Sequence, residues 1–178
     1  KHVPLDLNKA IYYFSIAASL KNNDAQFLLG YIYYTENMIF DIKKSIHYFT
    51  LAANNGNGDA QYYLGVIYYD GFYVEKNIIK AIDFMNLSEK NKNKKAAFFL
   101  GFLYHEGKNV NQDIHKSIHY YKSISSFNNK YAKNNLGIIY KNGFNDIIKQ
   151  NIGLAKEYFN EAIRQKNDYL SMHNLANI

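Results

Sequence analysis

The chain has 178 residues, of which 48% are hydrophobic, 20% are charged and none is cysteine, and its formal net charge at pH 7 is +6. This length fits one compact domain or one short array of repeats. The lack of cysteine excludes a disulfide framework, a thiolate metal site and a cysteine nucleophile. The positive charge comes from scattered lysines, so it favours acidic partners weakly and by itself gives no argument for nucleic acid.

The first predicted helix covers residues 9–18, and a different helical segment follows at 25–33. They read Lys9-Ala-Ile-Tyr-Tyr-Phe-Ser-Ile-Ala-Ala18 and Ala25-Gln-Phe-Leu-Leu-Gly30-Tyr-Ile-Tyr33. We name the glycine-centred segment helix A and the other segment helix B. In helix A, Ala25, Leu29 and Ile32 fall at positions i, i+4 and i+7, which places them on one face of an α-helix.

The two segments alternate along the rest of the chain. Helix B motifs return near residues 44–53, 80–85, 116–121 and 155–162, and helix A motifs near 60–68, 96–104 and 132–140. The marker glycines Gly30, Gly65, Gly101 and Gly137 are 35, 36 and 36 residues apart. A fixed period of this size is typical of a solenoid, in which one small unit stacks along an axis. We therefore predict an all-α solenoid of about four to five helix-turn-helix repeats of 35–38 residues.

The marker glycines and the turn residues have separate expected roles. A glycine inside a helix costs up to about 1 kcal/mol relative to alanine, so its recurrence predicts a close approach of a neighbouring helix. Asp24 and Asp59 precede helix A and are expected to cap it. Gly71, Gly107 and Gly143 fit left-handed terminators of helix A, and in the first repeat Asn37 is expected to adopt the same backbone.

We expect one repeat array over residues 1–178. Its helix A/B repeats are predicted near 24–55, 59–90, 95–126 and 131–165, with partial units at 1–20 and 169–178. The last partial unit is the start of a fifth helix A, in which Ala176 replaces the glycine. Neither end is a polar cap, although solenoids normally need capping repeats to cover their terminal apolar faces. The expectation is a fragment of a longer array, or another element that covers the ends.

These motifs resemble the Sel-1-like repeat, a relative of the tetratricopeptide repeat. The pattern Ala-x3-Leu-Gly-x2-Tyr-x2-Gly, a loop, and Lys-Ala-x2-Tyr-x3-Ala-Ala recurs over almost the whole chain. The second repeat matches best, at Ala60, Leu64, Gly65, Tyr68, Gly71, Val74, Lys80 and Ala81. Ser45 and Ser117 depart from the pattern, since both replace the alanine of helix B.

The resemblance implies a right-handed α-α superhelix that acts as a protein-protein interaction scaffold or adaptor. The best-known members are substrate-receiving adaptors of a ubiquitin ligase in endoplasmic-reticulum-associated degradation, and others are bacterial proteins of signalling and host interaction. Some bacterial relatives are described as β-lactamase-like enzymes, but those carry paired cysteines in each repeat and this chain has none. The resemblance leaves the localisation open between the endoplasmic reticulum lumen and the cytoplasm.

An aromatic stripe on helix A is the main candidate binding site. At about 100° per residue, its positions lie opposite the core face of each helix A. The stripe comprises Phe27, Tyr31, Tyr34, Tyr62, Tyr69, Phe98 and Phe102, and it fades at Asn134. One interpretation is burial against the next repeat. The other is a concave groove whose aromatic residues bind a peptide or a folded domain of another protein.

Other residues give weaker signals. His115 and His119 have the i, i+4 spacing of a metal site, but His119 shares its repeat position with His47 and Asp83, which indicates a polar surface column. The cluster Lys90, Lys92, Lys94 and Lys95 could bind nucleic acid, but such a run usually forms a solvated loop. The sequence contains no phosphate-binding loop and no catalytic constellation. We therefore expect no enzyme activity, no metal, no cofactor, no nucleic acid and no membrane span, since the richest apolar run, 96–104, is far short of about 20 residues.

Overall fold

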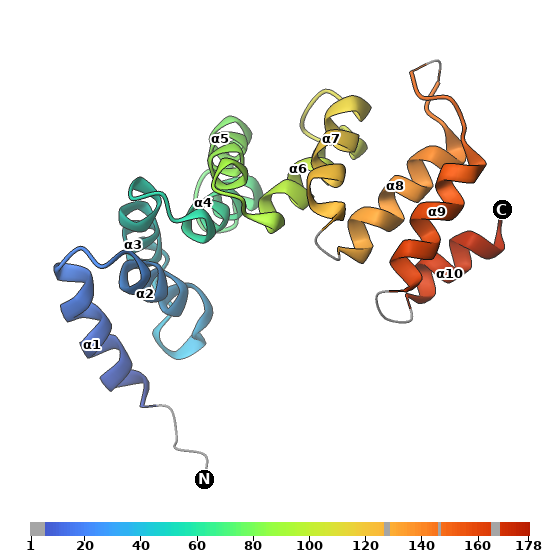
Figure 1. The fold of residues 1–178 in the computed structure, drawn as a ribbon. Helices are drawn as coiled ribbons and strands as arrows, with labels where there is room; N and C mark the ends of the chain where they lie inside the picture. Colours follow the sequence, from blue (N-terminus) through green and yellow to red (C-terminus); the bar gives the residue numbers. More distant parts are fainter. Residues whose placement is uncertain (1–5, 127–128, 146, 165–167) are drawn as a thin grey trace, which may run out of the picture. The chain divides into compact units, whose positions relative to one another are not determined.

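A computed structural model describes residues 6–126, 129–145, 147–164 and 168–178 (Figure 1). Within these residues it contains ten α-helices, one short 3-10 helix and a single isolated β-bridge between Phe144 and Ile148. The all-α class predicted from the sequence is therefore confirmed. No helix among the described residues is long and apolar enough to cross a membrane.

The helices follow the predicted alternation of B and A. The A helices are α2 (Asn23–Thr35), α4 (Gly58–Asp70), α6 (Lys94–Glu106), α8 (Lys130–Asn142) and α10 (Tyr169–Ala176). The B helices are α1 (Leu7–Ser19), α3 (Ile42–Asn54), α5 (Ile78–Lys90), α7 (Ile114–Ser125) and α9 (Ile152–Ile163). The 3-10 helix η1 (Asn37–Ile39) lies between α2 and α3.

The chain divides into two compact units, Lys1–Ala96 and Ala97–Ile178. In the first unit, α2 packs against α3 and α4 against α5, while α1 contacts α2 and α3 contacts α4. In the second unit, α8 packs against α9, and α7 and α10 contact α8 and α9 respectively. Within each unit, these helices therefore pack against their neighbours in sequence, as a solenoid requires.

The turns that lead into the A helices differ from the expectation in one respect. The side chains of Asn22 and Asn57 cap α2 and α4, accepting hydrogen bonds from the backbone N–H groups of Ala25 (2.8 Å) and Ala60 (2.9 Å). Asp24 and Asp59, predicted as caps, instead lie inside the first helical turn. The cap falls two residues earlier because the left-handed residue that ends the previous helix comes directly before the asparagine. That residue is Gly56 (φ 80°) before α4. In the equivalent turns it is Lys21 (φ 63°) before α2 and Lys92 (φ 62°) before α6.

In three repeats the glycine predicted to end the A helix has a positive φ, although the ψ of Gly143, −173°, lies outside the left-handed helical region. Gly71, Gly107 and Gly143 have φ values of 69°, 67° and 65°, a backbone region that favours glycine. The prediction for Asn37 is wrong. The first repeat ends α2 at Glu36 with φ −85° and continues into η1, so its shorter loop needs no left-handed residue.

The marker glycines lie where an A helix meets the next B helix. A Cβ atom built on Gly30 would lie 2.6 Å from the Phe49 ring, and one on Gly65 would lie 2.8 Å from the Met85 methyl group. The equivalent distances are 2.8 Å from Gly101 to the Tyr121 ring and 2.5 Å from Gly137 to the Phe159 ring. Since these four B-helix side chains are fully buried, a methyl group on any of the glycines would require the facing side chain to move.

Buried polar side chains join successive turns in the first unit. Gln61 donates through Nε2 to the carbonyl of Ala53 (3.0 Å), and its Oε1 accepts from the Asn91 side chain (2.8 Å). Gln26 makes the same pair of contacts one repeat earlier, with Ala18 and Asn55. Each glutamine thus connects the end of the previous B helix with the end of the next one.

Alanine substitution of Gly30 and of Gly65 should lower the free energy of unfolding by different amounts. Gly30→Ala forces a methyl group against a buried ring, so we expect a net loss of about 1–3 kcal/mol in the free energy of unfolding. Gly65→Ala meets the flexible end of Met85, which can change rotamer while the helix gains up to about 1 kcal/mol in propensity. Urea unfolding followed by circular dichroism should therefore show a much larger loss for Gly30→Ala. Equal losses would contradict this description of the contact.

Candidate functional site

The aromatic side chains of the first two repeats form one connected cluster. Tyr63 of α4 stacks on Phe49 of α3, with ring centroids 5.3 Å apart and an interplanar angle of 5°. The ring of Tyr63 also lies 6.1 Å from that of Phe27, 5.5 Å from that of Tyr31 and 5.7 Å from that of Tyr34. Three predicted stripe residues of α2 therefore meet a single ring of the next A helix.

Burial divides the members of this cluster. Phe49 is fully buried, Phe27, Tyr34 and Tyr63 are half-buried, and Tyr31 is 38% exposed. The inner rings thus fill the contact between repeats, while their edges and the Tyr31 ring remain at the surface. Both interpretations of the stripe, inter-repeat packing and an exposed aromatic surface, agree with these positions, and its role in binding stays a prediction.

The stripe residues of α4 lie beside lysine side chains. Tyr62 and Tyr69 are half-buried. Lys95 Nζ lies 5.8 Å from the ring centroids of both Tyr62 and Tyr63, and Lys76 Nζ lies 5.3 Å from that of Tyr69. A cation at this distance from an aromatic face is attracted by the ring electrons, by about 0.5–1 kcal/mol at exposed sites.

The remaining stripe residues lie in the second unit. Phe98 packs against the buried Tyr121 of α7 (5.7 Å between centroids) and against Tyr131 of α8 (6.3 Å). Phe102 is 47% exposed. Phe98 therefore occupies an environment like that of Phe27, between its own repeat and the following A helix.

Sequence reasoning missed Tyr63, although it carries most of the ring contacts. Helical phase alone places it between the core face and the stripe of α4. The contact follows a rule between repeats. The residue two positions after the first alanine of one helix A meets the residue three positions after the equivalent position of the next helix A, which is Ala60 in α4 and Ser171 in α10. Phe27 and Tyr63 obey it, and so do Asn134 and Asn174, which share a hydrogen bond of 2.9 Å. The aromatic pair Tyr62-Tyr63 was the available signal.

The phenol groups of Tyr34, Tyr62 and Tyr63 are neutral at physiological pH. Burial, followed by the neighbouring Tyr31 phenol, raises the pKa of Tyr63 to about 12. Burial and then the Asp70 carboxylate raise the pKa of Tyr34 and of Tyr62 above the ordinary value. These tyrosines can therefore donate hydrogen bonds while their rings offer apolar faces.

The stripe is replaced by a polar layer in the last described repeats. Buried Asn134 accepts a hydrogen bond from Asn174 Nδ2 (2.9 Å), and its side-chain oxygen lies 3.1 Å from Ser171 Oγ. Ser171 donates to Asp168, whose other carboxylate oxygen lies 3.1 Å from Lys130 Nζ. The aromatic surface thus ends at α8, and hydrogen bonds join α8 to α10 instead.

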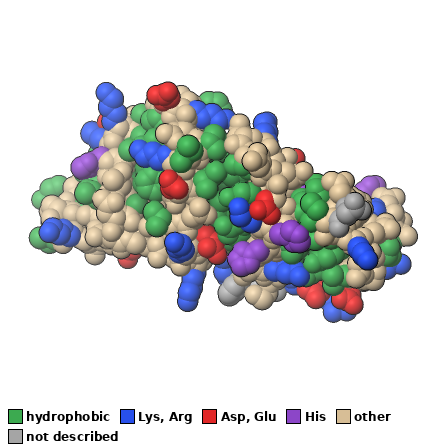
Figure 2. Space-filling view, turned by 90° about the horizontal axis from the view of Figure 1, so that it is seen from above, with side chains coloured by type: hydrophobic (Ala, Val, Ile, Leu, Met, Phe, Trp, Pro, Cys, Tyr) green, Lys and Arg blue, Asp and Glu red, His purple; other side chains and the backbone are tan. Residues whose placement is uncertain are grey.

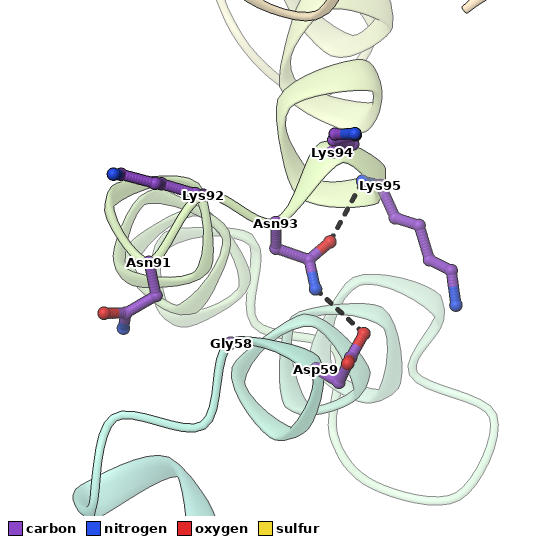
Figure 3. A pocket seen from close by; sticks show the side chains of 7 residues that line it. All are labelled: Gly58, Asp59, Asn91, Lys92, Asn93, Lys94 and Lys95. Atoms are coloured by element: carbon purple, nitrogen blue, oxygen red, sulfur yellow. Dashed lines mark hydrogen bonds between the residues drawn. The ribbon is translucent and has the colours of Figure 1, made fainter. Parts of the chain in front are cut away.

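The lysine cluster surrounds a shallow pocket at the turn between α5 and α6. The pocket has a volume of about 350 Å³ and is lined by Gly58, Asp59, Asn91, Lys92, Asn93, Lys94 and Lys95. Asn93 lies at its centre, where its side chain donates to Asp59 (2.9 Å) and accepts from the Lys95 backbone N–H (2.9 Å). The ammonium groups of Lys92 and Lys95 point in different directions (Figure 3), and a carboxylate lies between them. The lysines therefore do not converge on one anion.

The surface shows no dense block of one charge on the face seen in Figure 2, where hydrophobic side chains gather between scattered charged groups. His115 and His119 are both exposed on α7. Within the described parts of the chain, no group of three or more His, Cys, Asp or Glu side chains could hold a metal ion.

The family model of the Sel1 repeat matches the chain at residues 1–22, 23–57, 58–93, 94–126 and 130–167. The chain belongs to the Sel1 repeat family. The four longer matches each contain one A helix followed by one B helix. Membership in the Sel1 repeat family supports a general role as a protein-interaction scaffold. No curated protein matches the chain.

Solved structures of bacterial Sel1 repeat proteins are similar in fold. A Sel1 repeat protein of Oxalobacter formigenes is 27% identical, with a TM-score of 0.80 over 92% of this chain and 67% of that one. A protective antigen present in uropathogenic Escherichia coli strains, which displays an SLR fold, is 25% identical with the same TM-score of 0.80. That alignment covers 94% of this chain but 35% of the antigen, so the chain spans about a third of its length.

Helicobacter pylori cysteine rich protein B is a more distant structural relative. It is 23% identical, with a TM-score of 0.58 over 74% of this chain and 95% of that protein. This likeness concerns the fold alone. The present chain contains no cysteine.

The buried carboxylate of Asp168 gives a test of the polar layer. Burial by itself would raise the pKa of Asp168, but hydrogen bonds from Ser171 and the Lys130 ammonium outweigh burial and lower the pKa. The stabilisation is therefore fully present above about 3.9, the pKa of an unfolded aspartate, and is lost as the pH falls through the lower folded value. We expect Asp168→Asn to lower the free energy of unfolding at neutral pH by about 1–3 kcal/mol and to remove this part of its pH dependence.

The exposed Glu157 of α9 provides a matched control. Urea unfolding at a series of pH values should show little change for Glu157→Gln. An Asp168→Asn variant that kept the wild-type stability at neutral pH would contradict the ion pair as a stabilising contact.

Proposed function

We propose that the chain is a protein-interaction scaffold whose aromatic surface on the A helices binds a partner protein. The observation that carries this proposal is the set of half-exposed rings on successive A helices. Tyr31 and Phe102 are 38% and 47% exposed, and Tyr34, Tyr62 and Tyr69 are half-buried. Tyrosine is enriched among residues that dominate binding energy at interfaces, because it combines a large apolar face with a hydrogen-bonding tip.

We further propose that residues 1–178 form one Sel1 repeat array, which would present this surface over several repeats. Stacked repeats expose binding surface in proportion to their number. Partners would be peptides or folded domains. A narrower candidate role is the substrate-receiving adaptor of a ubiquitin ligase in endoplasmic-reticulum-associated degradation. It rests on the family resemblance, and co-purification of a membrane ubiquitin ligase with the full-length protein would test it.

We propose that the chain has no catalytic activity, since no nucleophile with an adjacent base is apparent in the sequence and the aromatic surface lacks one. A hydrolase screen of the purified chain tests this. Turnover abolished by the change of one residue would contradict it.

Alanine substitutions of Tyr62, Tyr69 and Phe98 test the binding surface. We expect each substitution to weaken the binding of a captured partner by about tenfold or more, because each removes a large ring from the interface. The partner is first captured by pull-down and its affinity is then measured by calorimetry. Tyr62→Phe should retain most of the affinity if the ring is the main contact.

The control for these variants is Tyr13→Ala, since Tyr13 is a 65% exposed tyrosine on a B helix. Circular dichroism must show an intact fold for each variant. Partner capture that survives all three substitutions unchanged would overturn the aromatic surface as the binding site.

Nucleic-acid binding by the lysine cluster is the alternative, and we expect it to be absent. The ammonium groups diverge and Asp59 lies within the pocket. A triple variant, Lys92→Gln, Lys94→Gln and Lys95→Gln, should behave like the wild type in fluorescence anisotropy with DNA and RNA oligonucleotides. Salt-sensitive binding by the wild type that the triple variant loses would establish the alternative.

A further inference from the structure

Asp70 is an unusual last residue for α4. The C-terminal end of a helix carries partial negative charge, so a carboxylate there is repelled unless a cation compensates it. Asp70 is exposed, and among the described residues it forms no ion pair. The repeat does not require a carboxylate at this position, since the equivalent residues are Thr35 in the first repeat and Asn142 in the fourth. In the third repeat, Glu106 lies 3.7 Å from His105.

Helix geometry places this carboxylate on the aromatic face of α4. Asp70 follows Tyr63 by seven residues, which is close to two full turns, so both project from the same side of the helix. That side is the one on which Tyr63 meets Phe27, Tyr31 and Tyr34 of α2. The effect of the Asp70 charge on the pKa of Tyr34 and of Tyr62 agrees with this placement.

The apolar surface continues beyond Asp70 into the loops. The Phe40 and Tyr73 rings, from the loops of the first and second repeats, lie 4.9 Å apart. Tyr73 is 55% exposed, and the neighbouring Phe72 is 84% exposed. The third repeat has Lys108 and Asn109 at the positions of Phe72 and Tyr73, so these aromatic residues are not part of the repeat pattern. Asp70 therefore lies on the same helix face as Tyr63 and three residues before Tyr73 in the sequence, with partly exposed aromatic rings in both places.

We propose that Asp70 and the tyrosines around it bind a lysine or arginine side chain of the partner segment that lies on the aromatic surface, with apolar residues on both sides of that cation. The carboxylate supplies a charged hydrogen-bond acceptor, and the faces of the neutral tyrosine rings attract the cation and pack against its aliphatic stem. This inference rests on the proposed function, since it specifies the chemistry of the partner.

The net charge of +6 does not prevent a cation from binding beside Asp70. The Debye length at physiological ionic strength is about 8 Å, so distant lysines are screened while Asp70 acts directly on a bound cation. The second repeat already contains cations beside rings, since Lys76 Nζ lies 5.3 Å from the ring centroid of Tyr69 and Lys80 Nζ lies 4.0 Å from that of Tyr68. A partner cation would repeat this contact with the added attraction of an unpaired carboxylate.

The test uses the whole chain and an array of synthetic twelve-residue peptides. Each peptide has a central arginine among randomised leucine, phenylalanine, tyrosine, alanine and serine residues, and it is printed beside versions with citrulline or glutamate at the centre. Citrulline keeps the shape of arginine without its charge. We expect the wild type to prefer arginine over citrulline by roughly tenfold in Kd, measured by calorimetry for the best peptide.

Three variants separate the charge of Asp70 from its structural role. Asp70→Asn should abolish the preference for arginine and slightly raise the melting temperature, since it relieves the repulsion at the helix end. Asp70→Lys should shift the preference to the glutamate peptides. Glu75→Gln changes the net charge equally and is exposed in the loop of the same repeat, and it should leave the preference unchanged.

The outcomes distinguish this inference from the proposed function. Peptides that bind equally with arginine, citrulline or glutamate, and lose affinity in Tyr62→Ala, would support the aromatic surface and overturn the role of Asp70. A preference for glutamate in the wild type would also overturn it, because the overall positive charge would then select the partner. Binding by none of the peptides would overturn both proposals for a linear partner segment.

Discussion

The contact between the marker glycine of each of the first four A helices and a large side chain of the following B helix is the constraint on which the rest of the structure depends. A methyl group on Gly30 or Gly65 would require Phe49 or Met85 to move. The Phe49 ring packs against Gly30 of its own repeat and also contacts the next repeat. Phe49 stacks there on Tyr63, so one close contact both closes a repeat and positions its neighbour.

The candidate binding surface follows from the same packing. Tyr63 stacks on the buried Phe49, and its ring also contacts Phe27, Tyr31 and Tyr34 of the preceding A helix. The rings are therefore ordered by their own repeat contacts, and a partner would not have to immobilise them. Such preorganisation lowers the entropic cost of association. Packing between repeats and partner binding are thus compatible roles for one set of aromatic residues.

The sequence is sufficient to predict the fold and the aromatic character of the A-helix surface. The features that it does not predict have physical causes. The repeat period and helical phase predict ten alternating helices, because each repeat obeys the same local rules. They do not predict that Tyr63 meets three rings of α2, since this contact depends on the register between repeats. The caps illustrate a second limit: Asn22, Asn23 and Asp24 are all good caps, and only the backbone of the preceding turn selects Asn22. The polar layer around Asn134 joins residues 37 positions apart, which local patterns do not connect.

A double-mutant cycle between Gly30 and Phe49 tests the central contact most directly. The cycle compares the free energies of unfolding of Gly30→Ala, Phe49→Leu and the double variant. The smaller, flexible leucine should make room for the added methyl group, so the double variant should be more stable than the sum of the single losses predicts, by about 1–3 kcal/mol. Additive losses, within about 0.5 kcal/mol, would show that the two side chains do not compete for space and would contradict the account.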